Sequence, residues 1–118
     1  MRGKALGDWG EDLAADYLRR RGYEILERQY RCRFGEVDLI ARRGRVVCFV
    51  EVKTRTNLAL GLPREYVDRR KRERLRLTAA CYLEEAGEDW GARFDVAEVY
   101  TADDGLEAAR IEYIENAF

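Results

Sequence analysis

Two strand-like segments joined by a short turn constrain the fold of this 118-residue chain more than any other feature. Residues 35–41 and 49–55 each alternate apolar with charged side chains, which is the pattern of a half-buried strand. The linker that joins them contains Arg42-Arg43-Gly44-Arg45, and a glycine in so short a connection predicts a tight turn. We therefore expect an antiparallel β-hairpin that carries charge on one face.

The hairpin gathers four charged side chains, because successive side chains of a strand point to opposite faces. They are Glu36, Asp38, Glu51 and Lys53, while Val37, Leu39, Val50 and Val52 point the other way. A type II′ turn at residues 44–45 places Asp38 opposite Glu51, and it also pairs Glu36 with Lys53. A type I′ turn one residue earlier places Glu36 opposite Glu51 instead. Either register keeps the four charges together, and only a three-residue loop separates them.

Adjacent carboxylates repel each other unless a positive group lies between them. Mg²⁺ (or Mn²⁺) suits this position, because Mg²⁺ binds one or two carboxylates, several waters and a substrate phosphate. The spacing offers Asp38, Glu51 and the backbone carbonyl of Val52 as ligands. Lys53 is placed to orient or deprotonate a water, or to stabilise charge on phosphorus, with Glu36 as an auxiliary acid. The alternative is that these groups are solvated charges or simple ion pairs.

The two segments, G-E-V-D-L-I-A and F-V-E-V-K-T-R, resemble the uncharacterised YraN-like family and, more distantly, the PD-(D/E)xK nucleases, especially archaeal Holliday junction resolvases. The resemblance covers nearly the whole chain, including Gly10-Glu11, Gly61-Leu62-Pro63 and Arg93-Phe94-Asp95-Val96. Two positions depart from the pattern: Val37 stands where a proline precedes the aspartate, and Gln29 stands where an asparagine is expected.

The resemblance implies a restriction endonuclease-like fold and a metal-dependent nuclease acting on DNA, including branched DNA. Asp38, Glu51 and Lys53 occupy the motif positions, and Glu11 matches the helical acid of the resolvase-like branch. A homodimer fits this picture, because small nucleases of this kind often cut two strands. A fold alone does not establish a function.

Composition excludes several kinds of chemistry. The chain has no histidine, which excludes triads with a histidine base and most zinc sites. Its cysteines, Cys32, Cys48 and Cys81, are odd in number and show no ligand spacing, so we expect neither disulfides nor zinc. Carboxylates and lysines remain as the plausible reactive groups.

Length and hydropathy predict a single domain over residues 1–118, with 47% hydrophobic residues to form its core. No apolar stretch approaches the roughly 18 residues of a membrane-spanning helix. The first residues lack the apolar core of a signal peptide. We therefore expect a cytoplasmic protein with no membrane partner.

Charge is distributed unevenly along the chain. Residues 1–78 contain 20 Lys and Arg against 12 Asp and Glu, whereas residues 79–118 contain 2 against 11. The balances of +8 and −9 sum to the net charge of −1. Such asymmetry favours a nucleic-acid partner whose phosphates are drawn toward the basic part. The alternative is that the two parts fold together and neutralise each other.

The remaining patterns predict an α/β fold with a mixed sheet of about five strands flanked by two main helices. The expected elements are a helix at 4–21, a strand at 23–30, the hairpin, a helix at 63–85 and strands at 93–100 and 110–114. The first helix presents a stripe of Leu6, Trp9, Leu13, Tyr17 and Leu18. The second buries Val67, Leu75, Thr78, Ala79, Tyr82 and Leu83.

Glu11 supports two interpretations. Asp8 followed by Glu11 resembles a capping box, in which Glu11 only satisfies backbone donors at the start of a helix. If the helix begins earlier, Glu11 lies inside it and can reach the hairpin acids. The sequence leaves both open.

Basic residues near the hairpin are candidates for nucleic-acid contact. Arg31 and Arg33 alternate with aromatic residues, Arg55 ends the second strand, and Arg70, Lys71 and Arg74 lie on the second helix. Such residues are also common on solvated helix faces and around aromatic cores. Lys71 lies beside the buried stripe, so it can point toward the site.

The leading hypothesis is a divalent-metal-dependent endonuclease acting on DNA. A second hypothesis is a nucleic-acid-binding module that keeps the fold without turnover. A third is an interaction protein whose basic and acidic faces drive self-association. Intact Asp38, Glu51 and Lys53 favour the first, because a protein that only binds phosphates gains nothing from facing carboxylates.

Overall fold

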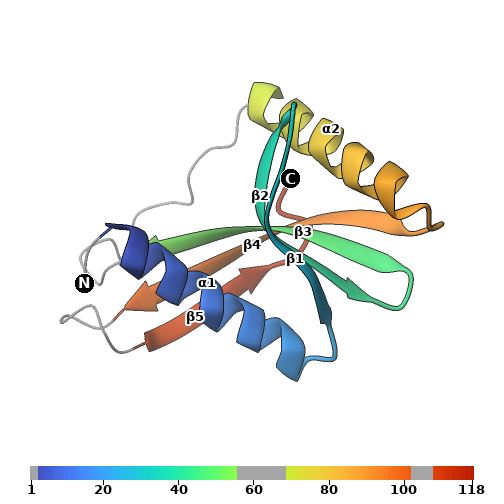
Figure 1. Cartoon of the computed structure of the whole chain (residues 1–118). Coiled ribbons are helices and arrows are strands. Elements are labelled where there is room, and N and C mark those ends of the chain that lie inside the picture. The colour runs from blue at the N-terminus through green and yellow to red at the C-terminus, as the bar shows by residue number, and fades with distance from the viewer. Residues whose placement is uncertain (1–2, 56–68, 102–107) are drawn as a thin grey trace.

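The fold is seen in a computed structural model that describes residues 3–55, 69–101 and 108–118. Its elements are α1 (Gly3–Arg20), β1 (Glu24–Cys32), β2 (Gly35–Arg43), β3 (Val46–Arg55), α2 (Arg69–Ala86), β4 (Gly91–Thr101) and β5 (Ala108–Ile114). Figure 1 shows the strands as one twisted sheet with a helix on each side. The predicted α/β class, with five strands and two main helices, is confirmed.

The sheet has the strand order β1-β2-β3-β4-β5. Its neighbours pair antiparallel except β3 and β4, which run parallel from Val46↔Gly91 to Arg55↔Tyr100. A parallel pair needs a long crossover, and α2 lies within that connection (Figure 1). The mixed sheet is as predicted, and β1 and β5 form its edges.

The two helices cover opposite faces of the sheet, each over its own apolar cluster. The α1 cluster contains Ala14, Ala15 and Leu18 of the helix and Leu39, Ala41, Cys48, Val50 and Ala97 of the sheet. The α2 cluster contains Ala79 of the helix and Val37, Ile40, Val47 and Phe49 of the sheet. Cys48 and Phe49 thus face different helices, because neighbouring side chains of a strand alternate.

Both helices end at a glycine with positive φ, as their sequences predict. Gly22 has φ +85°, and the Tyr23 amide donates to the Leu18 carbonyl while the Gly22 amide donates to the Arg19 carbonyl. These two bonds form a Schellman motif. Gly87 has φ +68° and its amide donates to the Leu83 carbonyl at the end of α2.

The buried face of α1 differs from the predicted stripe. Leu18 is fully buried, but Trp9, Leu13 and Tyr17 are only half-buried. The helix instead buries small residues and one acid: Gly10, Glu11, Ala14 and Ala15. Small side chains let α1 approach the sheet closely, so the periodicity of large apolar residues misplaced its inner face. On α2 the predicted Leu75, Thr78 and Ala79 are buried, with Tyr82 and Leu83 packed beside them.

The hairpin turn is the predicted two-residue type II′ turn. Arg43 pairs with Val46, and the register runs to Leu39↔Val50. Gly44 has φ +63°, whereas Arg45 does not adopt a positive φ. The alternative type I′ turn at residues 43–44 requires positive φ at both, and Arg43 does not adopt one, so this alternative is excluded.

The expectation that Val37 and Leu39 share a face is wrong. Val37 packs in the α2 cluster, while Leu39 packs in the α1 cluster. Regular alternation would place both on the same side. The strand therefore changes phase at Asp38, which is also where its pairing with β3 stops.

Some predictions lie outside the described residues. These are the segment Gly61-Leu62-Pro63 of the resemblance and the start of the second helix at residue 63 with Val67. Among the described helices, neither is long and apolar enough to cross a membrane.

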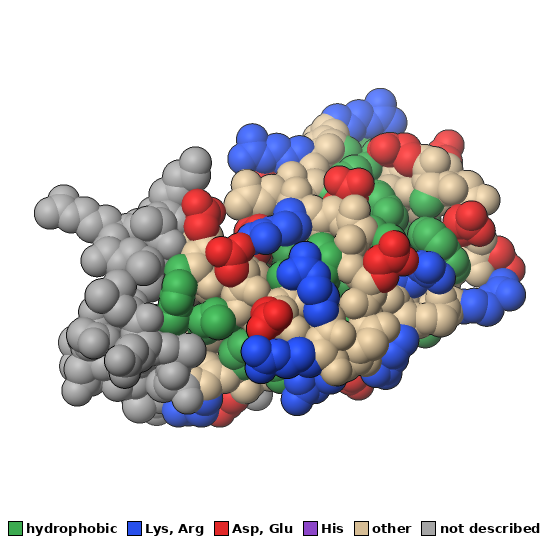
Figure 2. All heavy atoms as spheres, turned by 60° about the horizontal axis from the view of Figure 1, so that its bottom comes forward, with side chains coloured by type: hydrophobic (Ala, Val, Ile, Leu, Met, Phe, Trp, Pro, Cys, Tyr) green, Lys and Arg blue, Asp and Glu red, His purple; other side chains and the backbone are tan. Residues whose placement is uncertain are grey.

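The basic and acidic parts of the chain interdigitate on folding. Arg45 pairs with Asp89 at 2.7 Å, and Arg55 pairs with Glu98 at 3.6 Å. Figure 2 shows Lys and Arg side chains alternating with Asp and Glu over the face it presents. Cations and anions are thus mixed on this face, and the two ion pairs above join the basic part to the acidic part.

Candidate functional site

The candidate site lies where β2 and β3 separate. Their ladder ends at Leu39↔Val50, and the next position of β2 is Asp38. The Asp38 Oδ2 atom accepts a hydrogen bond of 2.7 Å from the Val52 amide of β3. A side chain thus takes the place of a backbone carbonyl, and it holds the two strands together while their backbones diverge.

The Asp38 carboxyl has a pKa raised to about 6. The main cause is burial, which penalises the charged form, and the nearby charges of Glu51 and Glu11 raise the pKa further. The hydrogen bond from Val52 and the charge of Lys53 act in the opposite direction. A positive charge added beside Asp38 would therefore stabilise its ionised form.

Glu51 lies next to two lysines, Lys53 and Lys71. Its Oε1 atom is 4.0 Å from Lys53 Nζ and 3.5 Å from Lys71 Nζ of α2. The Glu51 side chain is 16% exposed, so these contacts are shielded in part from water. The prediction that Lys71 points toward the site is confirmed, since it reaches Glu51.

Glu36 lies at the rim of the site and not in its centre. It forms an ion pair of 2.9 Å with Arg31, and both side chains are largely exposed. The cross-strand pair of Glu36 with Lys53 does not form in the ladder, because pairing ends at Leu39↔Val50. The expected convergence of all four charges is thus reduced to Asp38, Glu51 and Lys53.

Glu11 reaches the site from α1. The helix begins at Gly3, so Glu11 lies inside it and the capping-box interpretation is wrong. Its buried carboxylate accepts hydrogen bonds from Arg28 Nε at 2.8 Å and Gln29 Nε2 at 3.1 Å. Gln29 has φ +52°, a backbone conformation that asparagine adopts more readily than glutamine. The hydrogen bond from the Gln29 side chain to Glu11 helps to hold β1 in this conformation.

Gly10 explains how α1 comes so close to β3. A Cβ atom at this position would overlap Thr54 Oγ1, next to Lys53. Only glycine fits, and this close approach brings the adjacent Glu11 toward the site.

The predicted nucleic-acid contacts fall into two groups. Lys71 and Arg74 line a cavity of about 290 Å³ together with Glu36 and Glu51. Arg70 is exposed on the same helix. Arg31 pairs with Glu36, Arg33 stacks on Phe34, and Arg55 pairs with Glu98. The α2 residues thus adjoin the acids, whereas Arg31 and Arg33 lie toward the end of the β1–β2 hairpin.

Sequence reasoning missed Glu98 and Arg28. Glu98 is 3% exposed in β4, pairs in register with Lys53, lies 3.6 Å from Arg55 and accepts a 3.3 Å hydrogen bond from Tyr100. The sequence signal that could have identified Glu98 is an acid within the otherwise apolar run Val96-Ala97-Glu98-Val99. Arg28 gave no such signal, because its role depends on contact with α1.

The donor set for a metal comprises two carboxylates. Within the described ranges, no group of three or more acidic or cysteine side chains is close enough to hold a metal ion. Asp38 of β2 accepts a hydrogen bond from Val52, the residue that follows Glu51 in β3. Both carboxylates are hard oxygen donors, a set that suits Mg²⁺ completed by water and phosphate.

Comparison with known proteins identifies the relatives of this chain. Residues 10–99 match the model of the uncharacterised protein family UPF0102. A UPF0102 protein of Rhodococcus jostii is 46% identical over 97% of this chain and 96% of its own length. The chain belongs to this family. The resemblance to the YraN-like family is thereby confirmed.

Other UPF0102 proteins match over nearly their full length. The protein of Pelotomaculum thermopropionicum is 46% identical over 98% of this chain and 96% of its own length. The protein of Caldanaerobacter subterraneus subsp. tengcongensis is 41% identical over 98% and 95%. The UPF0102 family is described as uncharacterised, so its function has to be argued from the site.

Proposed function

We propose that this UPF0102 protein is a divalent-metal-dependent endonuclease that hydrolyses phosphodiester bonds in DNA, including branched DNA. The observation that carries the proposal is Asp38, a half-buried carboxyl with a raised pKa beside Glu51 and Lys53. Holding like charges together costs stability, so their placement needs a purpose beyond the fold. The resemblance of the D…E-x-K pattern to PD-(D/E)xK nucleases supports the same conclusion.

The residues present fit a metal ion. Asp38 and Glu51 would hold Mg²⁺ or Mn²⁺, and such an ion would counteract both the burial and the neighbouring negative charges that raise the pKa of Asp38. The bound ion would supply Lewis-acid activation of the phosphate and a more acidic water.

The chain's own residues would do the remaining work. Lys53 would hold the attacking water, or stabilise the charge that develops on the phosphate oxygens, from its position beside Glu51. Glu11 would act through Asp38, since its charge raises the Asp38 pKa while Arg28 and Gln29 fix its orientation. Lys71 and Arg74 would bind the backbone of the substrate along the cavity beside Glu51.

A second candidate function is DNA binding without turnover. It is favoured by the ion pair of Glu51 with Lys71 and by the proximity of Lys53, which already offset the charge of one proposed ligand. In that case the α2 cations would bind phosphate without help from a metal. The two candidates differ in whether Mg²⁺ changes the outcome.

Cleavage of labelled linear, flapped and four-way-junction DNA with Mg²⁺, Mn²⁺ or EDTA tests the proposal. We expect metal-dependent products that are lost in the Asp38→Ala and Lys53→Ala variants. Asp16→Ala is the matched control, because Asp16 is an exposed residue of α1 paired with Arg20. Absence of products on all three substrates, with binding that is insensitive to metal, would refute hydrolysis and support the binding function.

A further inference from the structure

A second pocket lies at the end of α1 that is remote from Glu11. It has a volume of about 150 Å³, and the residues that shape it are Tyr17, Tyr23, Tyr113, Arg21, Arg43 and Glu115. We call it the tyrosine–arginine pocket. It shares no residue with the Asp38 site. Arg43 is at the opposite end of β2 from Asp38, about 17 Å away for five residues of extended strand.

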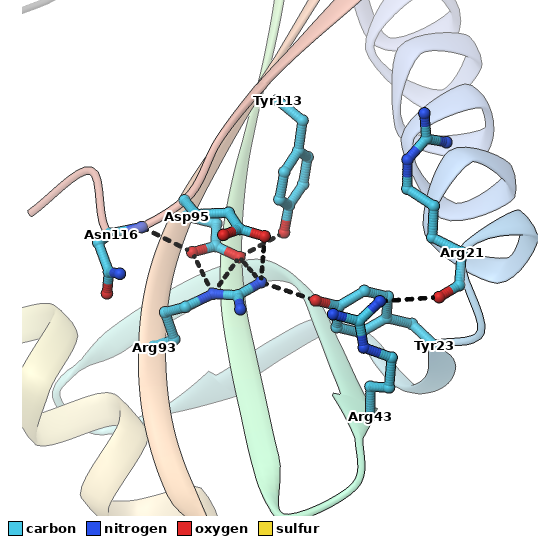
Figure 3. Close-up of polar contacts among 8 residues, drawn as sticks. Arg21, Tyr23, Arg43, Arg93, Asp95, Tyr113 and Asn116 are labelled. Atoms are coloured by element: carbon cyan, nitrogen blue, oxygen red, sulfur yellow. Dashed lines mark hydrogen bonds and ion pairs between the residues drawn. The ribbon is translucent and has the colours of Figure 1, made fainter.

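The walls of the pocket are held by a buried acid. Asp95 is fully buried and accepts hydrogen bonds from Arg93 at 2.9–3.1 Å, from the Tyr113 hydroxyl at 2.6 Å and from the Asn116 amide at 3.0 Å. Arg93 also donates to the Tyr23 hydroxyl at 2.9 Å. Figure 3 shows the Arg93 and Tyr113 side chains and the Asn116 backbone amide meeting at Asp95, with the Tyr23 hydroxyl bonded to Arg93. Two tyrosine rings are therefore fixed before any ligand arrives.

The cations of the pocket lie over tyrosine rings. The Arg21 guanidinium lies 3.6 Å above the Tyr17 ring, and the Arg43 guanidinium lies 4.4 Å above the Tyr23 ring. Arg43 donates one hydrogen bond of 3.0 Å to the Arg21 carbonyl. A guanidinium has five N–H donors, so most of them remain available.

The charges at the pocket are unbalanced. Among the described residues, Arg21 and Arg43 form no ion pair. By contrast, the neighbouring Arg20 pairs with Asp16, and Arg45 in the β2–β3 turn pairs with Asp89. The acids at the pocket are already engaged: Asp95 with Arg93 and Tyr113, and Glu115 with Arg93 at 3.5 Å. Burial and the bond to Asp95 raise the pKa of Tyr113, so its hydroxyl stays protonated. Two arginines that no described acid neutralises thus border the pocket.

We propose that the tyrosine–arginine pocket binds a phosphate monoester. Such a group carries between one and two negative charges at neutral pH, which matches two guanidiniums better than a single carboxylate does. The tyrosine rings provide an aromatic surface for the organic part of the ligand. The volume of about 150 Å³ accommodates a phosphate group. A free nucleotide and the phosphorylated end of a nucleic-acid strand share this chemistry.

Isothermal titration calorimetry with inorganic phosphate, thymidine 5′-monophosphate and thymidine tests this site. We expect the two phosphates to bind and thymidine to show no heat. Arg21→Gln and Arg43→Gln should each weaken phosphate binding by about tenfold or more, because each loses a charge-assisted contact. Arg45→Gln is the matched control, since Arg45 is exposed and paired with Asp89.

A further variant keeps the test valid if Arg43→Gln disturbs the fold. Arg43→Lys retains the charge but loses the planar fork, so intermediate binding is expected. Asp38→Asn should bind phosphate as the wild type does, which separates this site from the proposed nuclease site. Comparing 5′-phosphorylated with 5′-hydroxyl oligonucleotides distinguishes a strand end from a free nucleotide. The proposal is overturned if phosphate does not bind at millimolar concentration, or if Arg21→Gln and Arg43→Gln bind it like the wild type.

Discussion

Replacing Asp38 by asparagine should stabilise the protein at neutral pH when no metal is present. Asparagine has nearly the same shape and can still accept the Val52 amide, but it removes the buried charge. The pKa of Asp38 rises from 3.8 to about 6 on folding. Because each pKa unit corresponds to about 1.4 kcal/mol, the upper limit of the effect is about 3 kcal/mol. Partial exposure reduces this, and we expect about 1–2 kcal/mol.

The effect should depend on pH in a defined direction. A carboxyl with a raised folded pKa favours folding below its unfolded pKa, and this contribution is lost as pH rises through the folded pKa. Wild type and Asp38→Asn should therefore be about equally stable at pH 3.8 or below. They should diverge between pH 4 and 6 and keep a constant difference above about pH 7.

Thermal and urea unfolding in EDTA from pH 4 to 8 measure this difference. For a domain of this size, 1–2 kcal/mol corresponds to a rise in Tm of roughly 4–8 °C at pH 7.5. Asp16→Asn serves as the control, because its exposed pair with Arg20 predicts a change within about 0.5 kcal/mol. A variant that is less stable than wild type at pH 7.5, or a difference that does not vary with pH, would refute the account of Asp38.

Three further predictions follow from the contacts. Gly10→Ala should destabilise the protein by about 1–3 kcal/mol in urea unfolding, because the added Cβ overlaps Thr54 Oγ1. Gly7→Ala, in open space on the same helix, should leave stability unchanged or raise it. Equal effects of the two variants would contradict the close approach of α1 to β3. Asp95→Asn should lower the free energy of unfolding by about 3–5 kcal/mol, because Arg93 loses its buried charged partner. Asp89→Asn, at a side chain that is 98% exposed, should change it by less than about 0.5 kcal/mol. A loss under about 1 kcal/mol for Asp95→Asn would show that stability does not depend on this buried pair. Addition of Mg²⁺ or Mn²⁺ should raise the Tm of the wild type but not of Glu51→Gln; a metal-induced rise in both would exclude Glu51 as a ligand.

The hairpin and its charges were predictable because they depend on neighbours in sequence. Alternation identified the strands, and Gly44 limited the tight turn to two registers, of which the structure shows the type II′ one. The stripe of α2 was predicted for the same reason, since large apolar residues recur with the helical period. The fold class followed from the order of these elements.

The centre of the site was less predictable because it depends on contacts between distant segments. The phase change at Asp38 requires the Val52 amide of a separate strand, so alternation in β2 alone could not reveal it. Glu98 joins the site because β4 lies parallel to β3, a pairing that no local pattern encodes. The inner face of α1 was hidden because glycine and alanine, not large residues, make its closest contacts.

The hydrogen bond from the Val52 amide to Asp38 gives the protein an internal probe. An amide proton that donates to a carboxylate shifts its resonance when that carboxylate takes up a proton. The amide signal of Val52 should therefore move with a midpoint near pH 6, while that of Val50, which is paired with Leu39 in the ladder, should not. One backbone signal would thus report the charge of Asp38, and any cation bound there, without a change to the sequence.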